Sequence, residues 1–162
     1  MGIRGNLDTR MRKVDEGEAE ALIVAKAGLD RLGLGDRAIE ILDPSVMLSA
    51  PGQGALAIEI RASERRLLSL LAPLGDPAAR AETTAERAFL HRFGSGCATP
   101  IAALGRVKGE SLVLVGLVIA PDGAEQVRRE ISGNPADAAE LGRALAEECL
   151  AGGAARLIEV RE

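Results

Sequence analysis

The chain has 162 residues and 47% hydrophobic residues, enough for one ordinary domain or two small ones with a real core. Aromatic residues are nearly absent, so the core must be aliphatic, and the stacking platforms that bind single-stranded nucleic acid are missing. The formal net charge of −4 argues against a general polyanion binder, and any basic site must therefore be local.

The cysteine content and the apolar runs indicate where the protein works. Cys97 and Cys149 are too few for a disulfide framework. No apolar run is as long as a transmembrane helix, and the first residues lack the pattern of a signal peptide. These features predict a soluble cytoplasmic protein with reduced thiols, which binds neither membranes nor nucleic acid.

Two short helices are predicted near the start of the chain, at residues 8–17 and 26–32. Asp8 or Thr9 is a suitable cap for the first helix, and a glycine ends each of them. Between the helices, the apolar run 21–25 is typical of a strand buried on both faces. Helices and a buried strand in close succession predict an α/β segment over residues 1–48.

Further strands are expected within residues 36–48, at Ile39, Ile41 and 46–48, and again at residues 55–60. A strand buried on both faces needs neighbouring strands and covering helices. Residues 1–48 supply too few of either, and a strand pair alone is not stable in water. We therefore expect another chain, a second copy or a further part of the protein to complete this sheet.

The middle of the chain, residues 49–75, is interpreted as a hinge followed by one strand and one helix. The stretch 49–54 contains Pro51, Gly52 and Gly54, which favour turns between two apolar segments. Residues 64–71 have the pattern of an amphipathic helix.

Residues 76–162 predict a compact α+β domain. A long helix over 78–93 has an alanine and phenylalanine stripe, and its charged residues, Glu82 and Glu86 among them, lie off that face. Three strands with short turns between them predict an antiparallel meander at 101–107, 112–119 and 126–132. A last helix begins at the cap Asn134 and carries Cys149 on its apolar side, and a short segment over 154–160 closes the chain.

A glycine-flanked loop, Gly94-Ser95-Gly96-Cys97-Ala98-Thr99-Pro100, presents the other cysteine. The glycines permit positive φ and leave the sulfur uncovered, and the proline prevents the preceding helix from continuing. A thiol presented in this way can carry a covalent group. A small buried side chain or an unreactive surface thiol remains an alternative for Cys97.

Basic charge gathers in the first segment, at Arg4, Arg10, Arg12 and Arg31. Because Arg4-Gly5-Asn6 precedes a helix start, backbone N–H groups and guanidinium groups can converge there on an anion, above all a carboxylate. Alternatively, these arginines are solvated or pair with nearby acidic residues, which are Glu16, Glu18 and Asp30. His91, the sole histidine, has no metal-ligand companions at suitable spacing, and no phosphate-binding loop is present.

Several short motifs together resemble the C-terminal half of the hydroxymethylbilane synthase, or porphobilinogen deaminase, family. They occur in family order across nearly the whole chain. They are Arg4-Gly5-Asn6-x-x-Thr9-Arg10, Ala27-Gly28-Leu29-x-Arg31-Leu32-Gly33-Leu34, Pro51-Gly52-Gln53-Gly54-Ala55, Thr84-Ala85-Glu86-Arg87 and Gly96-Cys97-x-x-Pro100-Ile101.

The resemblance implies the C-terminal part of a three-domain fold. It would consist of an incomplete periplasmic-binding-protein-like α/β segment (1–48), a hinge and strand–helix return to the first domain (49–75), and a cofactor-carrying α+β domain with a three-stranded antiparallel sheet (76–162). Such enzymes condense four porphobilinogen units, with loss of ammonia, and release hydroxymethylbilane for haem-type tetrapyrroles.

The resemblance also implies roles for individual residues. A dipyrromethane cofactor would be attached to Cys97 through a thioether. Arg4 and Arg10 would bind the carboxylates of the cofactor, with Asn6 and Gln53 as further contacts. The incoming porphobilinogen or the growing chain would be bound by Arg31 and Gly28. No metal is expected.

The catalytic aspartate of the family has no match in this chain, because its motif lies in the N-terminal half. We therefore expect the isolated chain to be inactive and to need that half or self-association. The alternatives are one half of a split enzyme, or a non-catalytic ligand-binding or assembly module that would tolerate loss of the Cys97 thiol.

Overall fold

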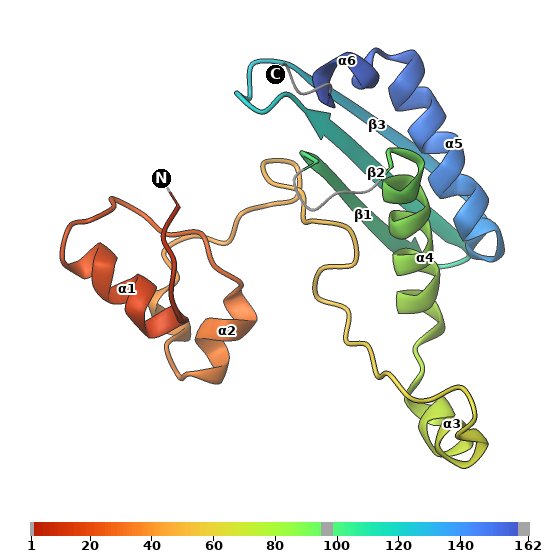
Figure 1. Ribbon diagram of the computed structural model, residues 1–162, viewed down its shortest axis with the longest axis horizontal. Helices are drawn as coiled ribbons and strands as arrows, with labels where there is room; N and C mark the ends of the chain where they lie inside the picture. Colours follow the sequence, from red (N-terminus) through yellow and green to blue (C-terminus); the bar gives the residue numbers. More distant parts are fainter. Residues whose placement is uncertain (1, 95–98, 159–162) are drawn as a thin grey trace. The chain divides into compact units, whose positions relative to one another are not determined.

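A computed structural model describes residues 2–94 and 99–158. The chain divides into two compact units, residues 1–43 and 44–162. Figure 1 shows the elements of both units in chain order.

The first unit contains two α-helices and one 3-10 turn: α1 (Leu7–Asp15), α2 (Lys26–Arg31) and η1 (Gly35–Arg37). Both expected helices are confirmed, but the expected caps of α1 are wrong. The cap is Asn6, whose side-chain oxygen accepts a hydrogen bond from Thr9 N at 2.9 Å. Asp8 and Thr9 lie inside the first turn, where an acidic side chain complements the helix dipole.

The strands expected before residue 61 are absent from the part of the chain that the structure describes. Residues 21–25, 38–43 and 55–61 have neither helix nor strand conformation, and many of their apolar side chains are exposed. Ile39 is fully exposed and Leu56 is 90% exposed. A strand forms only where a neighbour accepts its ladder hydrogen bonds, and the described residues provide no neighbour for these runs.

The second unit begins with a long irregular segment that contains α3 (Arg65–Leu71) and η2 (Ala72–Leu74). The expected helix at 64–71 is confirmed, but its leucines face solvent, among them Leu68 and Leu70. Residues 51–54 form turns, and Gly52 and Gly54 have φ of +75° and +90°. Pro77 starts the next helix, α4 (Pro77–Arg92), where its missing N–H costs nothing.

The remaining residues form the α+β arrangement that the sequence predicts. The meander of β1 (Ile101–Lys108), β2 (Ser111–Ile119) and β3 (Gln126–Gly133) is antiparallel in the order β1-β2-β3. It is followed by η3 (Pro135–Asp137), α5 (Ala138–Ala151) and α6 (Ala154–Ile158), and Asn134 caps the turn as expected. Figure 1 shows α4 and α5 lying together against one face of the sheet.

The core lies between these helices and that face of the sheet. Side chains at alternate positions of β2, such as Leu112, Leu114 and Val118, are buried, as the period of a strand requires. Phe89 of α4 and Leu145 of α5 pack with them, and Cys149 belongs to the same core, as expected. Gly116 on β2 leaves room for the Phe89 ring, because a Cβ there would lie 2.6 Å from it.

Candidate functional site

The first arginine motif folds into a capped helix start. Gly5 has a φ of +127°, and a Cβ at this position would lie 3.0 Å from Thr9 Cγ2, so the chain approaches α1 closely. Asn6 caps the helix, and its carbonyl accepts a hydrogen bond from Arg10 N at 3.0 Å. Arg4 and Arg10 therefore flank a helix N-terminus, whose partial positive charge favours anions.

Four carboxylates of the first unit form ion pairs, each with a cation other than the expected ligand-binding arginines. The pairs are Arg12 with Glu16 at 2.9 Å, Lys13 with Glu18 at 3.2 Å, Arg37 with Asp15 at 2.7 Å, and Lys26 with Asp30. Glu16, Glu18 and Asp30, which the sequence offered as partners of the arginines, are thus each paired with a cation nearby in the chain.

The guanidinium groups of Arg4, Arg10 and Arg31 make no ion pair or hydrogen bond with any residue in the described ranges. Arg4 and Arg31 are exposed, whereas Arg10 is half-buried. The Nε atom of Arg10 is buried and lacks a hydrogen-bond partner. An unsatisfied buried donor is costly, so this atom calls for an acceptor from outside the described residues.

Helix α2 carries both residues that the resemblance assigns to substrate binding. Arg31 is its last residue, and Gly28 lies one turn earlier. A Cβ on Gly28 would lie 3.5 Å from Leu7 Cδ2, so this side of α2 faces the beginning of α1. The first unit thus holds five of the seven expected site residues, Arg4, Asn6, Arg10, Gly28 and Arg31.

The other two expected site residues belong to the second unit. Gln53 is exposed in the turn at 51–54, and its side-chain oxygen accepts a hydrogen bond from Ala50 N at 3.3 Å. Cys97, the expected attachment point of the cofactor, lies outside the described residues.

Cys149 is the other cysteine, and its environment suppresses reactivity. Burial raises the pKa of its thiol from 9.0 to about 11, with a smaller opposing effect of Arg129. A buried thiol with a raised pKa is a poor nucleophile. Cys149 therefore serves packing.

Sequence reasoning missed Glu86, which it placed off the buried face of the long helix. The side chain is only 5% exposed and accepts two backbone hydrogen bonds, from Gly52 and Gly105. The residue stands inside one of the resembling motifs, but a glutamate on a charged helix is ordinarily a surface residue. Only its distant partners distinguish it.

The described residues contain no group of three or more His, Cys, Asp or Glu placed to hold a metal ion. No helix among them is both long and apolar enough to cross a membrane. The described residues thus form a small helical unit, in which Arg4, Arg10 and Arg31 have no ion-pair partner, and an α+β domain that follows it in sequence.

Comparisons with known proteins identify the family to which this chain belongs. Residues 1–69 match the family model described as "Porphobilinogen deaminase, dipyromethane cofactor binding domain", and residues 80–151 match "Porphobilinogen deaminase, C-terminal domain". The chain is 52% identical over 158 residues to porphobilinogen deaminase of Roseiflexus castenholzii and 50% identical over 161 residues to that of Acidothermus cellulolyticus. It therefore belongs to the porphobilinogen deaminase family.

The comparisons also show how much of the family's length is present. The two alignments cover 97% of this chain but only 52% and 49% of the relatives. The porphobilinogen deaminase of Trichlorobacter lovleyi is 45% identical, with 97% of this chain and 50% of the relative covered. The chain thus spans about half the length of the relatives it matches.

Proposed function

We propose that this chain provides the C-terminal half of a porphobilinogen deaminase, which condenses four porphobilinogen units and releases hydroxymethylbilane in the cytoplasm. The observation that carries the proposal is the partition of charge in the first unit. Arg12, Lys13, Lys26 and Arg37 have carboxylate partners, whereas Arg4, Arg10 and Arg31 have none among the described residues. Guanidinium groups in that state suit a ligand that brings its own carboxylates.

The chemistry of the substrate fits this set of donors. Each pyrrole of porphobilinogen and of the dipyrromethane cofactor carries an acetate and a propionate. Arg4 and Arg10 would hold carboxylates of the cofactor beside the N-terminus of α1, with Asn6 as a neighbouring contact. Arg31 and Gly28 on α2 would face the substrate or the growing chain, and Gln53 is proposed as a further polar contact to the cofactor. The chain binds and orients these groups rather than breaking a bond itself.

Cys97 is the proposed attachment point of the cofactor. When bound, the cofactor would supply the terminal pyrrole to which porphobilinogen units are added. The family model that residues 1–69 match is described as binding this cofactor, which supports the cofactor but does not include residue 97. The fixed guanidinium groups would neutralise the carboxylates and keep the reactive end in one orientation. The acidic group that acts on the pyrrole nitrogens would come from the N-terminal half.

The exposed apolar runs support a requirement for that other half. Ile23, Ile39, Ile41, Leu56 and Ile58 are all more than half exposed, although their sequences are those of buried strands. Burying such side chains against a protein partner would contribute about 1.5–3 kcal/mol for each. We propose that the N-terminal half buries these side chains. The alternative is that a second copy of this chain buries them.

The test is a chimaera in which the N-terminal half of the Roseiflexus castenholzii relative is joined to this chain. We expect turnover of porphobilinogen, and denaturing intact-mass spectrometry should show one dipyrromethane on the Cys97 peptide. Cys97→Ser should lose both the adduct and turnover. A folded chimaera that neither carries the adduct nor turns over would overturn the proposal.

Matched arginine variants test the charge partition in the same chimaera. Arg10→Lys should lower cofactor loading or raise the KM by about tenfold or more, because an ammonium group cannot make the bidentate contact. Arg12→Lys is the control, since its carboxylate partner is Glu16 of the same helix. Equal effects of the two changes would show that general charge, not a carboxylate site at Arg10, is being measured.

A second candidate function is a non-catalytic module that binds carboxylate ligands. The same free arginines support it, because they need no thioether to bind an anion. The Cys97→Ser chimaera distinguishes the two functions. A binding module keeps its ligand affinity after this change, whereas the deaminase loses its cofactor.

A further inference from the structure

Glu86 is a charged side chain buried within the second unit. It lies in the middle of α4 and is 5% exposed. Its Oε1 accepts a hydrogen bond from Gly105 N at 2.8 Å, and its Oε2 accepts one from Gly52 N at 2.6 Å. One carboxylate thus joins three segments: α4, strand β1 and the turn at 51–54.

The bond to Gly105 belongs to a regular pattern along the outer edge of β1. Ala103 N donates to Ser49 O at 3.2 Å, Gly105 N to Glu86, and Val107 N to Glu82 Oε1 at 2.9 Å. Alternate residues of an edge strand point their N–H groups outward, and these groups would otherwise be unpaired. Gly105 permits the approach, because a Cβ there would lie 3.0 Å from Glu82 Cα.

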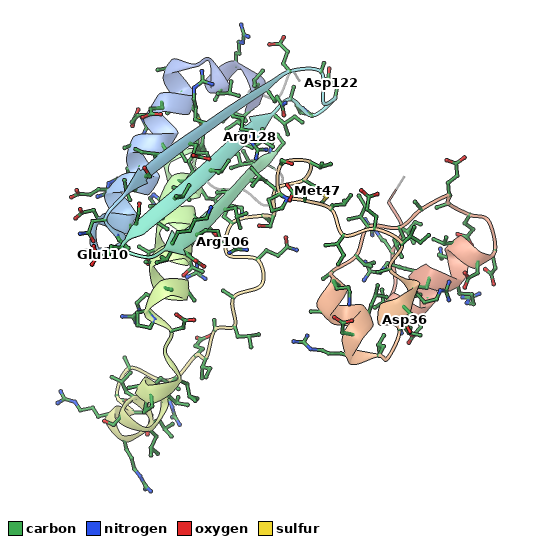
Figure 2. All side chains as sticks on the ribbon, turned by 180° about the vertical axis from the view of Figure 1, so that it is seen from behind. Asp36, Met47, Arg106, Glu110, Asp122 and Arg128 are labelled. Atoms are coloured by element: carbon green, nitrogen blue, oxygen red, sulfur yellow. The ribbon has the colours of Figure 1, made fainter. Side chains whose placement is uncertain are left out.

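The residues that precede the turn are also hydrogen-bonded to the sheet. The Arg128 guanidinium of β3 donates to Pro44 O at 3.2 Å and to Ser45 O at 3.5 Å. Figure 2 shows Arg128 on the sheet beside the segment that carries Met47. With the Ser49 contact, residues 44–52 are tied to the sheet or to α4 at three places along their length.

Burying the Glu86 carboxylate has an unfavourable desolvation free energy. Removing a charge from water costs several kcal/mol unless strong hydrogen bonds compensate for it, and an apolar side chain would bury more cheaply. Glu86 uses one oxygen for the strand and the other for the turn, so the gain comes from joining the two. Its neighbour Glu82, by contrast, binds the strand and the exposed Arg106 but not the turn.

We propose that Glu86 is a positioning residue that fixes the turn at 51–54, and with it Gln53, to edge strand β1. The turn then moves as one body with the α+β domain and is not the flexible joint that its glycines suggest. This role deepens the proposed function, and rests on it, in one respect only: Gln53 would be held at a constant place relative to the domain that carries Cys97.

The experiment is residue-resolved amide hydrogen exchange on the 162-residue chain by NMR. In the unaltered chain, the Gly52 amide should be protected by about tenfold or more over an unstructured glycine. In Glu86→Gln, the side-chain amide has one acceptor oxygen and an N–H group that cannot accept. The more deeply buried Gly105 bond should persist, and Gly52 should exchange about tenfold faster, since hydrogen bonds to charged groups are the strong ones.

Glu82→Gln is the matched control, because it alters a carboxylate on the same helix that binds the same strand. It should leave Gly52 exchange unchanged. Amides of β2, such as Leu114, should keep their protection in Glu86→Gln. Equal acceleration at Gly52 and Leu114 would mean that Glu86 serves only general stability, and would overturn the positioning role.

Unaltered protein decides the question even if Glu86→Gln fails to fold. Unprotected exchange of Gly52 in the original chain, or no scalar coupling from Gly52 N to the Glu86 side-chain carboxyl carbon, would contradict the role. None of these measurements uses the cofactor or turnover. Their failure is therefore distinct from failure of the proposed deaminase function.

Discussion

Residues 23–74 and residues 81–157 both contain apolar runs, but their large apolar side chains differ greatly in burial. From residue 81 to 157, large apolar side chains of α4, β2 and α5 share one core, and Phe89 and Leu145 are fully buried. The exposed large apolar side chains of the described residues all lie between residues 23 and 74. Hydrophobicity thus supplies a tendency to be buried, and burial follows only where neighbouring elements are present.

The largest expected effect comes from removing a core ring. Phe89→Ala should lower the free energy of unfolding of the second unit by about 3–5 kcal/mol, because the buried ring leaves a cavity. Ile39→Ala is the control in the first unit and should leave that free energy unchanged. Urea denaturation followed by circular dichroism measures both. A cost of more than about 1 kcal/mol at Ile39 would contradict the difference between the regions.

Thiol ionisation gives the packed region a pH dependence. The pKa of Cys149 is about 11 in the folded chain against 9.0 for the free group, so the native state binds more protons between these values. Stability should therefore fall as pH rises from 9 to 11, by up to about 2–3 kcal/mol. Denaturation midpoints across this range test the sign. Cys149→Ala should flatten the dependence, and an unchanged slope in that variant would contradict the assignment.

Two helical glycines should respond to alanine with opposite signs. A Cβ at Gly142 in α5 would clash with Ala85 O, so Gly142→Ala should cost about 1–3 kcal/mol through overpacking of α4 against α5. Gly28→Ala in α2 meets only an ordinary contact with Leu7 and should raise helix stability by up to about 1 kcal/mol. Thermal denaturation of the first variant and helical chemical shifts of the second measure these changes. The same sign in both would weaken the comparison.

The smallest expected effect concerns the cap of α1. Asn6→Ala removes the acceptor of the Thr9 N–H and should cost about 1 kcal/mol. Few side chains of the first unit are buried, so the loss should remain local to α1. Faster amide exchange at residues 10–13, with the β2 amides unchanged, is the expected result. Unaltered exchange in α1 would show that another group caps the helix.

The sequence by itself determined the features that depend on neighbours close in the chain. The helices at 26–32 and 78–93, the three-stranded meander and the Asn134 cap are set by periodicity, turn residues and capping, and the structure contains all of them. The resemblance carried by short motifs likewise pointed to the family that the comparisons show. The candidate ligand residues were found in the same way, and their roles stay predictions.

Only the tertiary structure decided which apolar runs become strands and which charges are buried. The run at 55–60 and the strand at 112–119 both have strand-like composition, but only the second has partners on both sides. Glu86 is buried because its acceptor oxygens meet N–H groups 34 and 19 residues away in sequence. Strand pairing and the burial of a charge both require hydrogen-bond partners distant in the chain, which local patterns do not specify.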